Sequence, residues 1–204
     1  MSAAIDAGSA GDTPAATVRD AQNSTPEFRR CAIRRARSVC VMKTLTPKAF
    51  ASSAFRIVPL PTEVAEEARR VAESGAEDHA IIKVDSATGY PCRHCLRWAQ
   101  PGERVILFPY ASIPPGHPYS ETGPIFVHAE RCERYGATGE YPVDFRNARV
   151  FRAYDANYNM IDAEVANGND PEAVIEKLLQ NPKTEFVDAR SVTRGCFTFR
   201  ILRA

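Results

Sequence analysis

The sequence predicts an α+β fold, with a mostly antiparallel sheet of about five to seven strands and two helices in a single domain. Short apolar stretches, several of them alternating with polar residues, recur through residues 54–204. Only two segments combine helical spacing of apolar residues with helix start and stop residues. Strands and helices do not strictly alternate along the chain, which favours an antiparallel sheet over a parallel one. The composition suits a globular domain, since 44% of the 204 residues are hydrophobic and 25% are charged.

Residues 1–53 are predicted to be a disordered extension rather than part of the domain. Residues 1–26 are mostly Ala, Ser, Thr, Gly and Asp, and such a composition buries too little to offset the entropy lost on ordering. The segment then becomes basic: residues 1–50 hold eight Lys or Arg and four Asp or Glu, which leaves 18 basic and 21 acidic residues for the rest. No role is assigned to Cys31 or Cys40 in this extension.

Two interpretations of this basic extension stay open. It is a solvated tail, or an upstream stretch if translation begins at Met42. Alternatively it is an organellar presequence, because residues 42–56 lack acids and are rich in hydroxyl groups.

The rest of the chain gives no sign of a nucleic-acid or membrane partner. Its slightly acidic balance lacks the basic surface that nucleic acids require. It contains no apolar run of the roughly 18 residues that a membrane span needs, and no apolar secretory signal follows Met1. We therefore expect a cytoplasmic protein, or an organellar one if the extension is a presequence, and no specific protein partner is indicated. In a reducing compartment the cysteines are expected as thiols, metal ligands or redox groups.

The domain is predicted to begin with a strand and a helix. Phe55–Val58 alternates apolar and polar residues, as a half-buried strand does. Prolines follow, and Thr62 is then expected to cap a helix that runs to residue 74. Gly75 supplies the stop signal.

Three further strands are expected at residues 80–84, 104–108 and 125–127. The second of them is continuously apolar after its first residue, which is typical of a buried strand. Residues 111–122 contain three prolines and a glycine without any apolar period, so a loop is predicted there.

The C-terminal part is predicted to contain the second helix and the remaining strands. Asp170 caps this helix, Pro171 takes its first position, and Asn181 followed by a proline ends it. The strands are expected at residues 148–154, 161–165, 185–187 and 196–202.

Four residues with metal-ligand chemistry fall into two pairs. Cys92 and Cys95 are separated by two residues, which lets both sulfurs converge on one metal ion. His128 and Cys132 are four residues apart, so they share a face if they lie on a helical turn. Together they would supply four ligands to a tetrahedral Zn²⁺ that stabilises the domain and catalyses nothing. The two pairs meet only if the strands 104–108 and 125–127 are antiparallel neighbours.

Two other hypotheses use the same cysteines. Arg93 and His94 lie beside the thiols, where positive or polarising groups favour a thiolate. A thiol-dependent oxidoreductase would then act through Cys92, with Cys95 resolving, although the segment after them is too short for a thioredoxin-like helix. Alternatively, no cofactor is bound, the cysteines are small buried side chains, and His128 is a core histidine.

A ligand-binding module is the third hypothesis for function, with its pocket under the loop 111–122. That loop carries an imidazole, a phenol and a carboxylate on His117, Tyr119 and Glu121. An anion site or a solvated face is predicted for Arg146, Arg149 and Arg152. No phosphate-binding loop, esterase elbow or His-Glu-x-x-His motif occurs, so the sequence indicates no particular reaction or substrate.

Several motifs in a fixed order also carry a family resemblance. They are Phe55-Arg-Ile-Val-Pro-Leu60, Gly89-Tyr-Pro-Cys-Arg-His-Cys-Leu-Arg97, Pro101-Gly-Glu103, Pro118-Tyr-Ser-Glu-Thr-Gly-Pro-Ile-Phe-Val-His128, Arg152-Ala-Tyr-Asp155 and Gly195-Cys-Phe-Thr-Phe-Arg200. Over about residues 54–204 the sequence resembles the domain of unknown function 1203 family. The resemblance implies one compact domain found in soluble proteins, with the Cys92 and Cys95 segment in its pattern. It brings no established activity, and it therefore implies no catalytic residue.

Overall fold

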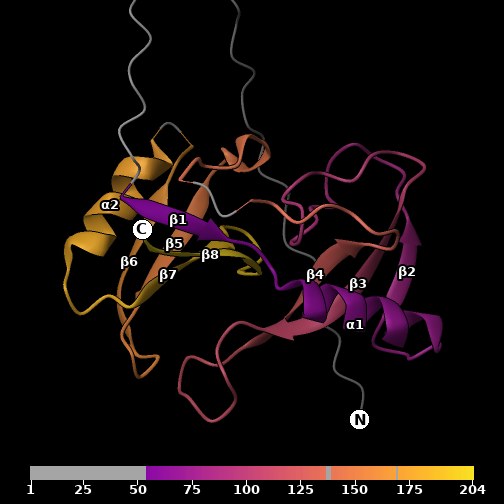
Figure 1. Ribbon diagram of the computed structural model, residues 1–204, viewed down its shortest axis with the longest axis horizontal. Helices are drawn as coiled ribbons and strands as arrows, with labels where there is room; N and C mark the ends of the chain where they lie inside the picture. The colour runs from indigo at the N-terminus through magenta and orange to yellow at the C-terminus, as the bar shows by residue number, and fades with distance from the viewer. Residues whose placement is uncertain (1–53, 137–138, 169) are drawn as a thin grey trace, which may run out of the picture. The chain divides into compact units, whose positions relative to one another are not determined.

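The structure, a computed structural model, describes residues 54–136, 139–168 and 170–204 (Figure 1). The predictions for residues 1–53, including the Met42 start and the presequence, lie outside the described residues. Among the described residues, no helix is long and apolar enough to cross a membrane.

The described chain has two helices and eight strands in two antiparallel sheets, which confirms the predicted α+β class. The five-stranded sheet has the order β1 (Phe55–Val58), β8 (Phe197–Arg203), β7 (Phe186–Ser191), β5 (Arg149–Tyr154) and β6 (Met160–Ala166). The three-stranded sheet has the order β2 (Ala80–Lys83), β3 (Arg104–Ala111) and β4 (Thr122–His128). The first sheet joins the two ends of the described chain, because β1 pairs with β8, whereas the second is formed by consecutive strands.

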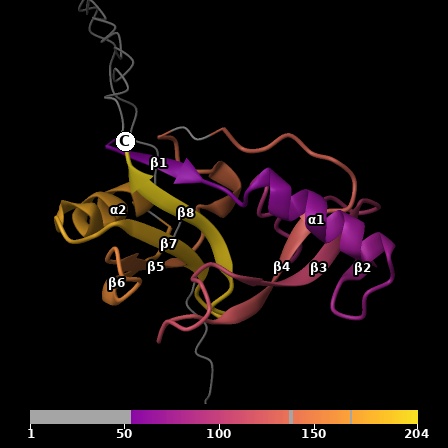
Figure 2. The same cartoon turned by 60° about the horizontal axis from the view of Figure 1, so that its bottom comes forward.

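One face of the five-stranded sheet packs against α2 (Pro171–Gln180), as Figure 2 shows. Phe151 and Phe199 of the sheet and Ile175 of the helix are fully buried in the same core cluster. The predicted N-cap is confirmed, because the Asp170 carboxylate accepts a hydrogen bond from the backbone nitrogen of Ala173 at 3.1 Å.

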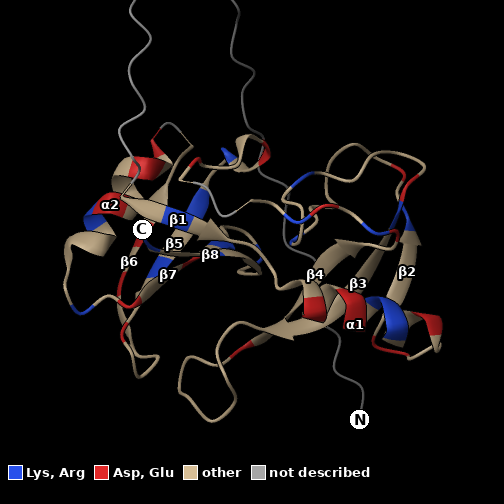
Figure 3. Cartoon of the chain, in the orientation of Figure 1, with Lys and Arg blue, Asp and Glu red and all other residues tan. Residues whose placement is uncertain are grey.

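The other helix, α1 (Thr62–Glu73), packs on the three-stranded sheet through Ala65 and Ala68. Along the rest of its surface, acidic residues come first, basic residues follow, and an acidic residue ends the helix (Figure 3). The predicted cap was wrong: Thr62 is already the first helical residue, and no side chain caps the helix. The Thr62 hydroxyl instead lies 3.1 Å from Nε2 of His94, so it joins the helix to the segment between β2 and β3.

The strands β3 and β4 pair over their whole length, from Val105 opposite His128 to Ala111 opposite Thr122. This confirms the antiparallel neighbourhood on which the joining of the two ligand pairs depends. Both strands extend further than their apolar residues predict, and the loop between them is correspondingly shorter.

Contacts from the segment between β2 and β3 and from β3 tie the two sheets together. Arg93 donates from Nε to the backbone oxygen of Phe197 in β8 at 2.8 Å. The ring of Phe197 also lies 5.3 Å from that of Tyr110 in β3. The side chain of Arg93 therefore links its own loop to β8.

Candidate metal centre

The Cys-rich loop, residues 84–103 between β2 and β3, presents Cys92 and Cys95 on a tight turn. Pro91 and Trp98 pair as an isolated antiparallel bridge. Within that bridge, the nitrogen of Leu96 donates to the oxygen of Cys92 at 3.1 Å. Leu96 has a φ of 52°, which reverses the chain immediately after Cys95. The element that directly follows the cysteines is the strand β3 and not a helix, so the turn differs from the thioredoxin-like arrangement.

His128 and Cys132 come from the end of β4 and the irregular segment after it. The helical turn that would place them on one face does not form, since residues 129–136 have neither helix nor strand. The chain is held there by hydrogen bonds, because the nitrogen of Ala129 donates to the oxygen of Arg104 at 2.9 Å. Arg69 of α1 donates to the oxygen of His128 at 3.1 Å.

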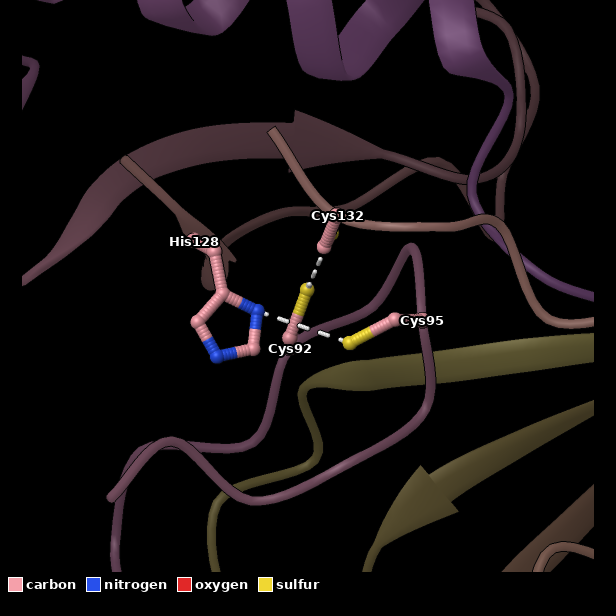
Figure 4. Close-up of side chains that lie close together, drawn as sticks. All are labelled: Cys92, Cys95, His128 and Cys132. Carbon is pink, nitrogen blue, oxygen red and sulfur yellow. Dashed lines mark hydrogen bonds between the residues drawn. The ribbon is translucent and has the colours of Figure 1, made fainter. Parts of the chain in front are cut away.

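These two pairs meet in one cluster (Figure 4). The sulfurs of Cys92 and Cys132 are 3.9 Å apart, and the Cys95 sulfur lies 3.4 Å from Nδ1 of His128. All four ligand atoms lie within 4.8 Å of one another. A tetrahedron with metal–sulfur bonds of about 2.3 Å has edges of about 3.8 Å. The four side chains, which we call the metal cluster, therefore lie close enough together to hold one metal ion.

A carboxylate orients the histidine of the metal cluster. Oε2 of Glu103 lies 3.3 Å from Nε2 of His128, while Nδ1 faces the sulfurs. Histidine ligands of metals commonly donate their second ring nitrogen to a carboxylate, which fixes the tautomer and the ring orientation. Sequence reasoning missed Glu103, because only the pairing of Val105 with His128 brings the residue before β3 next to the imidazole.

Cys132 has two nitrogen neighbours outside the cluster. Nδ1 of His94 lies 3.2 Å from its sulfur, and Arg69 donates to the sulfur from 3.9 Å. When Nδ1 of His94 carries the proton, it donates to the sulfur and Nε2 accepts from the Thr62 hydroxyl. His94 was predicted to polarise Cys92, but its hydrogen-bonding partner is Cys132.

In the absence of metal, the pKa values indicate that the cluster holds a thiolate, which hydrogen bonds among the sulfurs and His128 stabilise. Hydrogen bonds from Cys132 and Cys95, with a smaller one from His128, hold the pKa of Cys92 well below its usual range despite burial. Hydrogen bonds to Cys92 and Cys95 raise the pKa of His128 to about 10. The pKa of Cys132 is raised, first by its hydrogen bond to Cys92. Burial lowers the pKa values of Arg93 and His94, and the negative charge of Cys92 opposes this for both, so the two residues do interact electrostatically with that thiolate.

The weaker candidates are not assembled into a comparable site. His117 packs against the ring of Tyr158, with centroids 4.7 Å apart, and Tyr119 packs edge-on against Tyr154. Glu121 forms ion pairs with arginines of β5 and β7. A small cavity of about 190 Å³ lies at the ends of this loop, and the ligand-binding hypothesis for it stays a prediction.

The three arginines for which an anion site or a solvated face was predicted do not share a partner. Arg146 pairs with Glu172, and Arg152 pairs with Glu121 at 2.7 Å. Among the residues that the structure describes, Arg149 has no carboxylate partner.

One comparison with known proteins found a match. A family model described as "Protein of unknown function (DUF1203)" matches residues 89–203, which include all four residues of the metal cluster. No curated protein and no solved structure gives a significant match.

Proposed function

We propose, for a chain that belongs to the DUF1203 family of proteins of unknown function, that the metal cluster binds a structural Zn²⁺. The ion would fasten the Cys-rich loop to the end of β4. The observation that carries the proposal is the convergence of four ligand atoms within 4.8 Å from two segments far apart in the sequence.

The chemistry of the ligands favours zinc. Three thiolates and one imidazole are soft to borderline ligands, which suit Zn²⁺ and disfavour Mg²⁺ or Ca²⁺. The carboxylate of Glu103 supports the imidazole as the outer partner of a metal-bound histidine does.

Four protein ligands complete a tetrahedron and leave no coordination position for a substrate. Three thiolates and Zn²⁺ carry a net charge of −1, and two arginines lie near them. Arg69 donates to the sulfur of Cys132, and the negative charge of Cys95 raises the pKa of Arg97. The surrounding charge therefore supports a closed structural site.

A cleft of about 630 Å³ reaches the cluster from solvent, with His128 and Cys132 in its wall. It provides the entry path that a metal site needs.

The experiment is metal analysis of the full chain purified without chelator. We expect about one zinc ion per chain and none in Cys92→Ser or Cys132→Ser. Cys196→Ser is the matched control, since Cys196 is a cysteine outside the cluster and should keep the metal. Absence of bound zinc, with unchanged folding of Cys92→Ser, would contradict the proposal.

Burial gives the thiol-dependent oxidoreductase hypothesis little support. The Cys92 side chain is 0% exposed, whereas reactive thiolates are partly accessible. Its lowered pKa suits a metal ligand equally well, because metals bind the thiolate. Alkylation with iodoacetamide separates the two: a redox thiol reacts rapidly near neutral pH, whereas a metal-bound thiolate is expected to react only after zinc is removed.

A further inference from the structure

A cavity of about 570 Å³ lies between the Cys-rich loop, the three-stranded sheet and the turn that joins β7 to β8. Its walls are mainly apolar and include the rings of Trp98, Phe126 and Phe145. Its size falls within the range of about 300–1,000 Å³ that is usual for small-molecule sites. None of its lining residues belongs to the metal cluster.

Two buried arginines line this cavity. Arg93 is 5% exposed and Arg149 is 7% exposed. Arg93 donates to the backbone oxygens of Pro91 and Phe197. Arg149 donates to the oxygen of Ala148 at 3.1 Å, and its buried Nε has no hydrogen-bond partner.

No carboxylate balances these groups, although the thiols of Cys196 and Cys92 act on Arg93 as negative charges. The lining residues include no Asp or Glu, and within the described ranges neither guanidinium forms an ion pair with a carboxylate. A third arginine, Arg194, lies exposed at the rim. Burial lowers the pKa of Arg149, as expected for a buried positive charge without a counter-ion.

Other buried arginines of the same protein are paired. Arg69 forms an ion pair with Glu66 at 3.1 Å. Arg190, 3% exposed, forms one with Glu121. An unpaired buried charge is costly. The two arginines at the cavity therefore suit a site in which a bound ligand supplies the negative charge.

We propose that this cavity binds a small organic anion, a carboxylate or phosphate ester on an apolar body. The anionic group is held by the guanidiniums of Arg93 and Arg149, whose planar forks match carboxylate and phosphate oxygens. The apolar body lies against the aromatic walls. This site is separate from the zinc proposal and does not depend on it.

The chain has a single tryptophan, and Trp98 lines the cavity, so its fluorescence reports binding there. We propose to titrate the full chain with phenyl phosphate and with benzoate, which carry the two head groups on similar rings. Inorganic phosphate controls for charge without an apolar body, and benzyl alcohol controls for the body without charge.

We expect a saturable change in Trp98 emission with at least one aromatic anion, at least tenfold tighter than with either control; the tighter anion assigns the head group. Arg149→Gln should weaken binding by about tenfold or more, since it removes a charge-assisted hydrogen bond. Arg56→Gln is the matched control, because Arg56 is exposed on β1 and does not line the cavity.

The wild-type titration decides the proposal without any variant. Absence of a saturable change with both anions up to about 10 mM, where even a millimolar site would be largely occupied, overturns it. If Arg149→Gln does not fold, the exposed Arg194→Gln replaces it, with an expected loss of a few-fold. Wild-type affinity in every folded variant at these two positions also overturns the proposal.

Discussion

The metal cluster and the cavity draw on neighbouring residues of one loop, but their polar groups are partnered in opposite ways. In the cluster, both ring nitrogens of His128 have partners, and the sulfur of Cys132 has nitrogen neighbours. At the cavity, Nε of Arg149 has none, and no lining residue is acidic.

This difference determines what the binding of a ligand would change in each region. A metal would replace protons in a network that is already complete, so its binding adds mainly to stability. An organic anion would instead pair with arginines that have no carboxylate partner among the described residues, so its binding would depend on those arginines. Arg93 belongs to both regions, because it lies in sequence between two cysteines of the metal cluster and also lines the cavity.

The largest expected effect is loss of the metal. Cys132→Ser, or removal of zinc by a chelator, should lower the free energy of unfolding by about 4 kcal/mol under conditions where free metal exceeds its dissociation constant a thousandfold. Denaturant unfolding with and without chelator measures it. Cys196→Ser should stay within about 0.5 kcal/mol of wild type. Equal stability with and without metal would show that the cluster has no structural role.

The second prediction compares an unpaired arginine with a paired one. Arg200 donates to the carboxylate of Asp188 at 2.8 and 3.1 Å, and Asp188 is 0% exposed. Arg200→Met would leave that carboxylate buried and unpaired, at a cost of about 3 kcal/mol. Arg149→Met removes a charge that has no carboxylate partner and only the Phe145 ring beneath it at 5.3 Å, so it should cost less than about 1 kcal/mol, or stabilise the protein, without ligand.

Denaturant midpoints of these two variants give the comparison. A loss of similar size in both would mean that Arg149 has a counter-charge in the folded protein and that the two regions do not differ as described.

Glu103→Gln tests the outer partner of the cluster. It should weaken metal binding by about 10- to 100-fold without unfolding the chain, because the carboxylate no longer orients the His128 imidazole. Competition with a chromophoric chelator measures the affinity. Glu130→Gln is the control, since this exposed carboxylate pairs with Arg104 outside the cluster. Equal affinities for the two variants would exclude an orienting role for Glu103.

The last comparison is the pH dependence of stability with and without metal. The raised pKa of His128, about 10 against an ordinary 6.5, contributes stability that is full below pH 6.5 and lost as the pH rises through 10. The lowered pKa of Cys92 contributes stability that is full above its ordinary pKa of 9.0 and lost as the pH falls through the folded value.

Together, the two shifts cancel below about pH 9, as far down as pH 6.5 or the folded pKa of Cys92, whichever is higher, because the metal-free folded and unfolded states then hold equal numbers of protons. Metal-free stability should be level across that range and fall above it. The zinc-loaded protein should gain stability across the same range, by about 1.4 kcal/mol per pH unit for each proton that zinc displaces. Unfolding at several pH values separates the two, and parallel profiles would contradict the metal assignment.

Local sequence patterns predicted much of the fold because their causes are local. The Asp170 cap and Pro171 mark the second helix, and apolar runs mark the strands. Thr62 shows the limit, since its hydroxyl satisfies the cap pattern but contacts His94, 32 residues away.

The candidate site was predictable for a similar reason. Cysteine and histidine have few other roles at such spacing, so residue type and order alone nominated the four members of the metal cluster. The way in which the four residues come together was not predictable. Hydrogen bonds to β3 and α1, and not a helical turn, hold the segment that carries His128 and Cys132.

The sequence by itself determined the α+β class, the strands and helices, and the four candidate ligands, because propensity and spacing act over a few residues. Only the tertiary structure decided the division into two sheets, the position of Glu103 behind His128, and the burial of Arg93 and Arg149 at one cavity. These features depend on the pairing of β1 with β8 and of β3 with β4. Such register is set by long-range burial and hydrogen bonding, which local spacing does not encode.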